Sequence, residues 1–192
     1  MTTIRLEEDA RGVARLTLTR SEKRNALSGE MIEELTAAAG EIAASSTIRV
    51  VVLSGEGDVF CAGGDLGWMR AQMAAEPAAQ RRAAMGLAMM LKALNEVPVP
   101  LIGRVQGNAF GGGIGLMSVC DVVVAVEGAS FGLTETRLGL TPATIGPYVV
   151  ARRGAARARR VFFSSRVFDV AEAVELGLVA RVAPASGLDA AV

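Results

Sequence analysis

Residues 101–118 have the sequence LIGRVQGNAFGGGIGLMS, which passes from an apolar run through a glycine cluster into a helical pattern. The run 101–105 predicts a buried strand, and the helix is expected to follow the cluster from residue 114. The apolar run 50–53 leads in the same way into a glycine-rich stretch, 55–65. Repeated strand, turn and helix predict an α/β fold with largely parallel strands, and the two turns at carboxyl ends of strands indicate a shared crevice.

The rest of the chain continues the alternation of strands and helices. Period-2 alternation predicts the first strand at 13–19, and Ser28 can cap the helix that follows. The other expected elements are helices at 31–42, 77–94, around 159–163 and at 170–176, and strands at 122–126 and 178–182. No linker divides the chain, so we expect a single domain over residues 1–192.

The charge balance gives no global field that would attract nucleic acid or an anionic membrane. Lys plus Arg and Asp plus Glu number 20 each, so we expect a small-molecule substrate. The start of the chain lacks a signal peptide, and no apolar run reaches the length of a membrane span, so we expect a soluble, cytoplasmic protein. A basic run is interpreted as a solvated helix face or as contacts between subunits; it comprises Arg152, Arg153, Arg157, Arg159 and Arg160.

The chain contains no histidine, which excludes Ser-His-Asp and Cys-His catalysis and His-ligated zinc. Cys61 and Cys120 lack metal-ligand spacing and are expected to pack as reduced, small apolar groups. No metal is expected, and proton transfer must use a carboxylate, Lys, Tyr or water.

Each glycine cluster precedes a helix, and both can turn peptide N–H groups toward a ligand that a Cβ would otherwise block. The N-terminus of a helix adds unpaired donors and a positive dipole end, so two such clusters can form an oxyanion hole. Alternatively, the glycines only permit tight turns and close packing. Neither cluster has the spacing of a P-loop or of a dinucleotide fingerprint, which disfavours NTP and NAD enzymes.

Five motifs in a fixed order carry a family resemblance: RNAL at 24–27, FCAGGDL at 60–66, QGNAFGGG at 106–113, CD at 120–121 and FGLTE at 131–135. This order resembles the crotonase (enoyl-CoA hydratase/isomerase) superfamily over nearly the whole chain. The resemblance implies a ClpP-like spiral of ββα units with a helical C-terminal part. It also implies an acyl-coenzyme A thioester as substrate, with coenzyme A as part of that substrate and no separate cofactor.

The resemblance assigns catalytic roles to Gly64, Gly112 and Glu135. The backbone N–H groups of the two glycines would bind the thioester oxygen, and losing one such donor typically costs about 3 kcal/mol of transition-state stabilisation. Glu135 would transfer protons, although a surface salt-bridge role is the alternative. The further residues expected to bind substrate are Arg24, Ala26, Ala62, Asp65, Leu66, Trp68, Phe110, Gly111, Gly115 and Tyr148. Arg24 would meet a phosphate of coenzyme A or remain a solvated turn residue, and Tyr148 would orient substrate or simply pack.

Gly115 departs from the hydratase pattern, which commonly has a first glutamate at this position. One glutamate suffices to move a proton between two carbons, as in related enoyl-CoA isomerases. Residues 137–150 nevertheless resemble bacterial methylglutaconyl-CoA and isohexenylglutaconyl-CoA hydratases, which suggests a branched or carboxylated enoyl-CoA. We therefore expect a hydratase (a lyase) adding water across the 2,3 double bond, with an isomerase or a noncatalytic acyl-CoA-binding protein as alternatives.

The end of the chain bears on its expected assembly. Crotonases usually continue into further helices that complete a trimer, and these helices are expected to be missing or incomplete after Val192. The family resemblance implies a homotrimer or a dimer of trimers.

Overall fold

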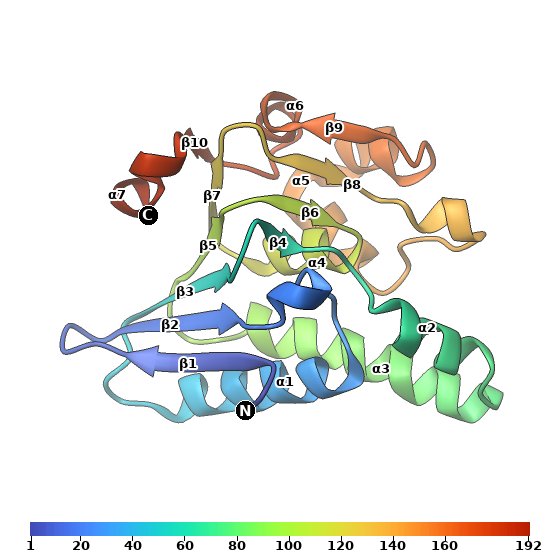
Figure 1. The fold of residues 1–192 in the computed structure, drawn as a ribbon, viewed down its shortest axis with the longest axis horizontal. Coiled ribbons are helices and arrows are strands. Elements are labelled where there is room, and N and C mark those ends of the chain that lie inside the picture. Colours follow the sequence, from blue (N-terminus) through green and yellow to red (C-terminus); the bar gives the residue numbers. More distant parts are fainter.

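Two β-sheets organise the chain, and from β3 to β8 successive strands alternate between them (Figure 1). The computed structural model describes residues 1–192. The larger sheet has the order β1-β2-β3-β5-β7-β10, and the smaller sheet has the order β4-β6-β8-β9. The strands are β1 (Ile4–Glu8), β2 (Val13–Leu18), β3 (Val50–Gly55), β4 (Val59–Cys61), β5 (Leu101–Val105), β6 (Asn108–Phe110), β7 (Val122–Val126), β8 (Ser130–Gly132), β9 (Val167–Asp169) and β10 (Arg181–Ala183).

Helices connect the strands and cover the sheets. They are α1 (Gly29–Ala44), α2 (Leu66–Met73), α3 (Pro77–Asn95), α4 (Gly112–Val119), α5 (Gly146–Phe162), α6 (Val170–Glu175) and α7 (Leu188–Ala191), with 3-10 turns η1 (Ser21–Lys23), η2 (Glu135–Leu138) and η3 (Ala185–Gly187). The expected cap of α1 is present, because the Ser28 hydroxyl accepts a hydrogen bond from the Met31 N–H at 3.2 Å.

The predicted α/β fold and its parallel pairing are confirmed. All neighbours in the larger sheet are parallel except β1 and β2, and in the smaller sheet only β8 and β9 are antiparallel. The pairs β3–β4, β5–β6 and β7–β8 each give their first strand to the larger sheet and their second to the smaller. These ββα units place the carboxyl ends of β4 and β6 side by side (Figure 1).

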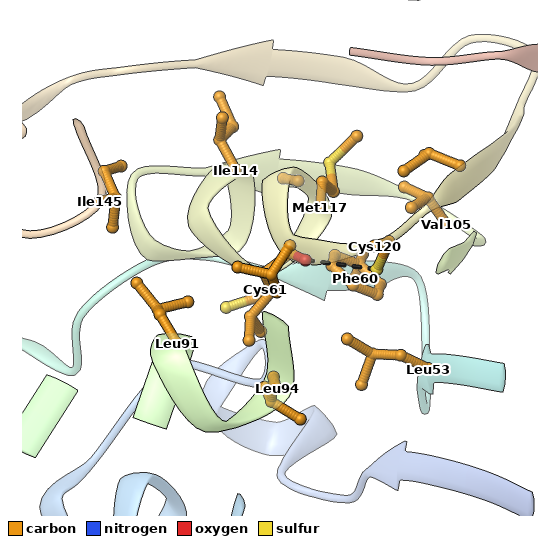
Figure 2. Close-up of a cluster of buried hydrophobic side chains, with 14 of the residues drawn as sticks. Leu53, Phe60, Cys61, Leu91, Leu94, Val105, Ile114, Met117, Cys120 and Ile145 are labelled. Carbon is orange, nitrogen blue, oxygen red and sulfur yellow. Dashed lines mark hydrogen bonds between the residues drawn. The ribbon is translucent and has the colours of Figure 1, made fainter. Parts of the chain in front are cut away.

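Helix α4 runs through the centre of the hydrophobic core. Its residues 113–119 are all buried, and it packs against α3, α5 and the strands β4 and β6. Figure 2 shows Ile114 and Met117 of α4 among side chains from β3, β4, β5 and α3. Cys61 and Cys120 are free and buried there, as expected, and burial raises the pKa of both thiols to about 12.

Asn25 fixes the turn between β2 and α1. It has a left-handed backbone (φ 52°) and a fully buried side chain. Its amide Nδ2 donates to the carbonyl oxygens of Glu56 and Val59 at 2.9 and 2.8 Å. This side chain therefore fastens residues 24–27 to the connection between β3 and β4.

Several elements differ from their prediction. Strand β1 precedes the strand expected to be first. The resemblance implied ββα units, but periodicity did not locate their second strands because three residues give too weak a signal. Helix α5 begins at Gly146, well before the helix expected around 159–163, and Gly154 (φ 77°) interrupts its helical backbone. Strand β10 begins later than expected, at Arg181.

The basic run is only partly a solvated face, contrary to the prediction. Arg153 is 4% exposed, and all three of its guanidinium nitrogens are buried without a hydrogen-bond partner. Burial lowers its pKa to about 10, and the neighbouring Arg152 adds to the effect. Arg157, Arg159 and Arg160 are exposed.

None of the helices combines the length and apolar character that crossing a bilayer requires.

Replacing Asn25 tests its anchoring role. Asn25→Ala removes two buried hydrogen bonds. It also places alanine in a left-handed conformation, which asparagine tolerates better. We therefore expect the free energy of unfolding to fall by about 2–4 kcal/mol. Urea denaturation measures this loss. Asn95→Ala, at the exposed end of α3, is the control and should change stability by less than about 0.5 kcal/mol. An equal effect in both variants would contradict the assignment.

Candidate active site

The two glycine turns that follow β4 and β6 touch each other. Gly63 and Gly111 have left-handed φ angles of 96° and 47°, which let the chain turn sharply after each strand. A Cβ at Gly63 would lie only 3.1 Å from the Phe110 carbonyl oxygen and 3.6 Å from the Gly112 nitrogen. Glycine is needed here because the two backbones approach each other this closely.

Leu27 holds the first glycine turn in place. Its N–H donates to the Gly63 carbonyl at 2.7 Å, and its carbonyl accepts from the Asp65 N–H at 2.9 Å, which makes an isolated parallel bridge to Gly64. The N–H of Gly64 donates to no backbone carbonyl. This donor is therefore available to a ligand.

Gly112 offers the second donor. It is the first residue of α4, so its N–H has no acceptor within the helix and lies at the positive end of the helix dipole. Gly64 and Gly112 line the same cavity of about 250 Å³. The crevice expected at the two turns is thus present, and its two glycines are suited to stabilise an oxygen that becomes negative.

Glu135 lines this cavity as well. Its side chain lies against the second turn, because a Cβ at Gly111 would be 3.2 Å from Glu135 Oε1. The other carboxyl oxygen, Oε2, is buried and has no hydrogen-bond partner. Burial raises the pKa of Glu135, and its own backbone N–H opposes the shift. A carboxyl group with a raised pKa holds a proton more readily, which suits a group that takes and returns one.

The cavity is otherwise free of ionisable side chains. Its remaining lining residues are Leu27, Trp68, Met69, Gln72, Met73, Gln80, Ala83, Ala84, Leu87, Leu140, Thr141, Pro142, Ala143, Thr144 and Ile145. Apolar residues predominate, and the few polar ones are neutral amides and hydroxyls. Glu135 is therefore the only group in the lining that can exchange a proton near neutral pH.

Asp65 supports the first glycine turn from outside the cavity. Its carboxylate caps α2 by accepting from the Trp68 N–H at 3.0 Å, and it pairs with Arg20 at 3.1 Å. The Trp68 hydrogen bond is the main cause that lowers the pKa of Asp65. Arg20 also donates to the Ala26 carbonyl at 2.6 Å, so it joins residues 24–27 to the start of α2. Sequence reasoning missed Arg20, since only the tertiary fold reveals its two partners.

The structure brings together some of the expected substrate-binding residues and not others. Trp68 lines the cavity, and Gly111 contacts the carboxyl group of Glu135. Outside the cavity lining lie Arg24 and Leu66, which are exposed, the buried Ala26, and the half-buried Ala62, whose N–H donates to the Arg24 carbonyl at 3.0 Å. The ring of Phe110 packs at Gly132, also outside the lining.

Tyr148 faces a different crevice. Its hydroxyl donates to the Ala88 carbonyl at 3.4 Å, and it lines a polar hollow with Ser118, Asp121 and Arg152. It is absent from the lining of the cavity that contains Glu135.

Gly115 lies one helical turn beyond Gly111, buried beneath Ile145. A Cβ at this position would be 2.6 Å from Ile145 Cγ2 and 3.1 Å from Ile145 Cβ. The space that a side chain at 115 would need is therefore filled by Ile145, which lines the cavity in its place. The segment 137–150 was noted in the sequence, but nothing in it identified Ile145 as the neighbour of Gly115.

Comparisons with known proteins agree with the geometry. Residues 8–191 match the family model described as enoyl-CoA hydratase/isomerase. The chain is 36% identical over 172 residues to the enoyl-CoA hydratase ACTT6 of Alternaria alternata, covering 90% of this chain and 56% of that protein. It is 33% identical over 179 residues to the human mitochondrial methylglutaconyl-CoA hydratase, covering 92% of this chain and 52% of that protein. The chain thus spans little more than half the length of these two relatives.

A solved structure shares the fold. The crystal structure of an enoyl-CoA hydratase from Shewanella pealeana is 36% identical and superimposes with a TM-score of 0.94, covering 98% of this chain and 70% of that chain. The crotonase fold expected from the motifs is thereby confirmed.

The contact between Gly115 and Ile145 can be tested by a double-mutant cycle. Gly115→Ala should destabilise the fold by about 1–3 kcal/mol because the new Cβ collides with Ile145. Ile145→Ala should cost about 2–5 kcal/mol, and the double variant should lose less than the sum because the collision is relieved. Gly40→Ala is the control, since a Cβ there meets nothing within 4 Å, and it should stabilise α1 by roughly 0.5–1 kcal/mol. Strict additivity at 115 and 145 would show that the contact is absent.

The buried carboxyl of Glu135 should make stability depend on pH. Because its pKa is raised in the folded state, the folded protein keeps this proton to a higher pH, and stability falls as the pH rises from the ordinary value of 4.5 through the raised one. Glu135→Gln should therefore gain stability over the natural protein at pH 8, and the gain should shrink toward pH 4. Urea denaturation at both pH values measures it. An equal stability difference between Glu135→Gln and the natural protein at pH 4 and pH 8 would argue against burial of the charge.

Proposed function

The chain belongs to the enoyl-CoA hydratase/isomerase family, and from this premise we propose that it is an enoyl-CoA hydratase. The observation that carries the proposal is the meeting of Gly64, Gly112 and Glu135 in one cavity. Two free N–H donors and one desolvated carboxyl group are what an enolate intermediate and a proton transfer require.

In the proposed reaction, Gly64 and Gly112 donate their N–H groups to the thioester oxygen of the substrate. Glu135 takes a proton from water while the water oxygen forms a bond to C3, and the electron pair of the C2–C3 double bond moves into the thioester as an enolate. Glu135 then returns that proton to C2, and the electron pair of the enolate forms the new C–H bond. Fixed donors favour the charged enolate over the neutral thioester, so their interaction lowers the barrier.

A second candidate is an enoyl-CoA isomerase. The observation that favours it is the absence of any other ionisable side chain in the cavity lining. Glu135 would remove a proton from C2 of a 3-enoyl thioester and return it to C4, which needs no bound water. The buried, unpartnered carboxyl oxygen of Glu135 argues against a noncatalytic acyl-CoA-binding protein, because binding alone does not require such a group.

We propose a short, branched acyl group as the substrate. The apolar wall formed by Leu87, Leu140 and Ile145 suits it, and the cavity volume lies below the usual range of about 300–1,000 Å³ for ligand sites. The relative named methylglutaconyl-CoA hydratase also supports branching. A carboxylated acyl chain fits the cavity less well. No Lys or Arg lines the cavity, so the carboxylate of the chain would have to reach solvent.

We also propose an assembly, on the family resemblance, and the cellular location expected in the sequence analysis. Trimers or dimers of trimers, in the cytoplasm, are the expectation. The exposed Met85 and Met89 on α3 offer apolar surface for contacts between copies, and the exposed Arg24 offers its charge to a phosphate of coenzyme A.

A substrate panel distinguishes the two reactions. We would incubate the protein with crotonyl-CoA, 3-methylglutaconyl-CoA and a 3-enoyl-CoA and follow the conjugated thioester absorbance, with products identified by mass. Gain of one water by a 2-enoyl substrate supports the hydratase, and a mass-neutral shift of the 3-enoyl substrate supports the isomerase. Inertness toward all three, with the fold intact, would contradict both.

Glu135→Gln tests the proton carrier in either reaction. Losing a positioned acid–base group should lower kcat by roughly 10²–10⁴-fold while the fold is kept. Glu175→Gln on the exposed face of α6 is the matched control and should retain full turnover. Full turnover by Glu135→Gln would overturn the catalytic assignment.

A further inference from the structure

Ile145 fills the space next to Gly115 in the wall of the cavity. It is 3% exposed, and its Cγ2 lies 2.6 Å from the place where a Cβ at Gly115 would be. No side chain fits at 115 while Ile145 is present. Figure 2 shows Ile145 beside α4, opposite Leu91. The side chain thus closes the inner wall of the cavity over the first turn of this helix.

Ile145 and the carboxyl of Glu135 lie against two glycines at the start of α4. Glu135 Oε1 lies against Gly111, whereas Ile145 lies against Gly115, and the Gly115 N–H donates to the Gly111 carbonyl at 3.2 Å. Both side chains line the cavity that also contains Gly64 and Gly112. An acyl chain whose thioester oxygen is held at Gly64 and Gly112 would therefore meet both of them.

No charged group faces Glu135 from the other walls. Helices α2 and α3 contribute Trp68, Met69, Gln72, Met73, Gln80, Ala83, Ala84 and Leu87, and residues 140–145 contribute no ionisable side chain. The nearest cation on η2, Arg137, donates instead to the Ser165 carbonyl at 2.7 Å. The surroundings of the carboxyl are thus set by apolar packing.

We propose that Ile145 is a positioning residue that leaves Glu135 as the only proton carrier in the cavity and shields its carboxyl from bulk water. This inference rests on the proposed acyl-CoA chemistry and deepens it. When Glu135 takes a proton from C2, the C–H electron pair enters the enolate and an O–H bond forms on the carboxyl. With Ile145 in place, the proton returns to carbon more often than it exchanges with solvent.

The test uses a matched pair of substitutions. Ile145→Val keeps Cγ2 and an apolar surface. Ile145→Thr has nearly the same shape as the valine variant, but its hydroxyl can hold water. Butanoyl-CoA in D2O is the probe, because exchange of its C2 hydrogen needs neither hydration nor isomerisation. We expect Ile145→Thr to accelerate this exchange by roughly tenfold or more over the natural protein, and Ile145→Val to match the natural protein.

A second readout needs no substrate. The carboxyl of Glu135 can be titrated by 13C NMR, with Glu135→Gln to assign its signal, and Ile145→Thr should move its pKa toward the ordinary value while Ile145→Val does not. Ile42→Ala, a buried substitution in α1 that does not line the cavity, controls for general loosening and should leave this titration unchanged.

The outcomes separate this inference from the proposed function. Unchanged titration in a folded Ile145→Thr would overturn the role of Ile145, whatever the protein catalyses. A shifted titration and faster exchange, with no turnover of any enoyl-CoA by the natural protein, would support Ile145 and contradict the proposed hydratase and isomerase activities.

Discussion

The close approach of two backbone turns is the constraint on which the rest of the structure depends. Gly63 and Gly111 follow adjacent parallel strands and both have positive φ angles, and a Cβ at Gly63 would lie 3.1 Å from the Phe110 carbonyl oxygen. This contact puts Gly64 and Gly112 into one cavity and creates the surface against which Glu135 lies. A side chain at Gly63 would press on the second turn and disturb the placement of the two donors beside the carboxyl.

Groups outside the cavity hold these turns. Leu27 bridges to Gly64 through two backbone hydrogen bonds, Asn25 binds two carbonyls with one amide, and Arg20 joins Asp65 to the carbonyl of Ala26. All three residues come from the segment between β2 and α1. That segment therefore sets the geometry of the site without contributing an acid or a base, which explains why a polar turn there carries so many buried contacts.

The sequence identified the parts of this arrangement that are local. Continuous apolar runs predicted β3, β5 and β7, and the glycine clusters predicted where the crevice would form. The smaller sheet was missed because β4 and its partners have three residues each, which is too short for a period-2 signal. Arg153 looked solvated in the sequence, yet tertiary packing buries it, and the contact between Ile145 and Gly115 joins residues thirty positions apart that no periodicity links.

The central claim is that two glycine N–H groups bind one thioester oxygen. A crystal structure of the protein with bound acetoacetyl-CoA tests it most directly. We expect the thioester oxygen about 2.7–3.1 Å from the backbone nitrogens of both Gly64 and Gly112, with the acyl carbons toward Glu135 and Ile145. A thioester oxygen bound by neither nitrogen, or by only one with the acyl chain outside this cavity, would contradict it.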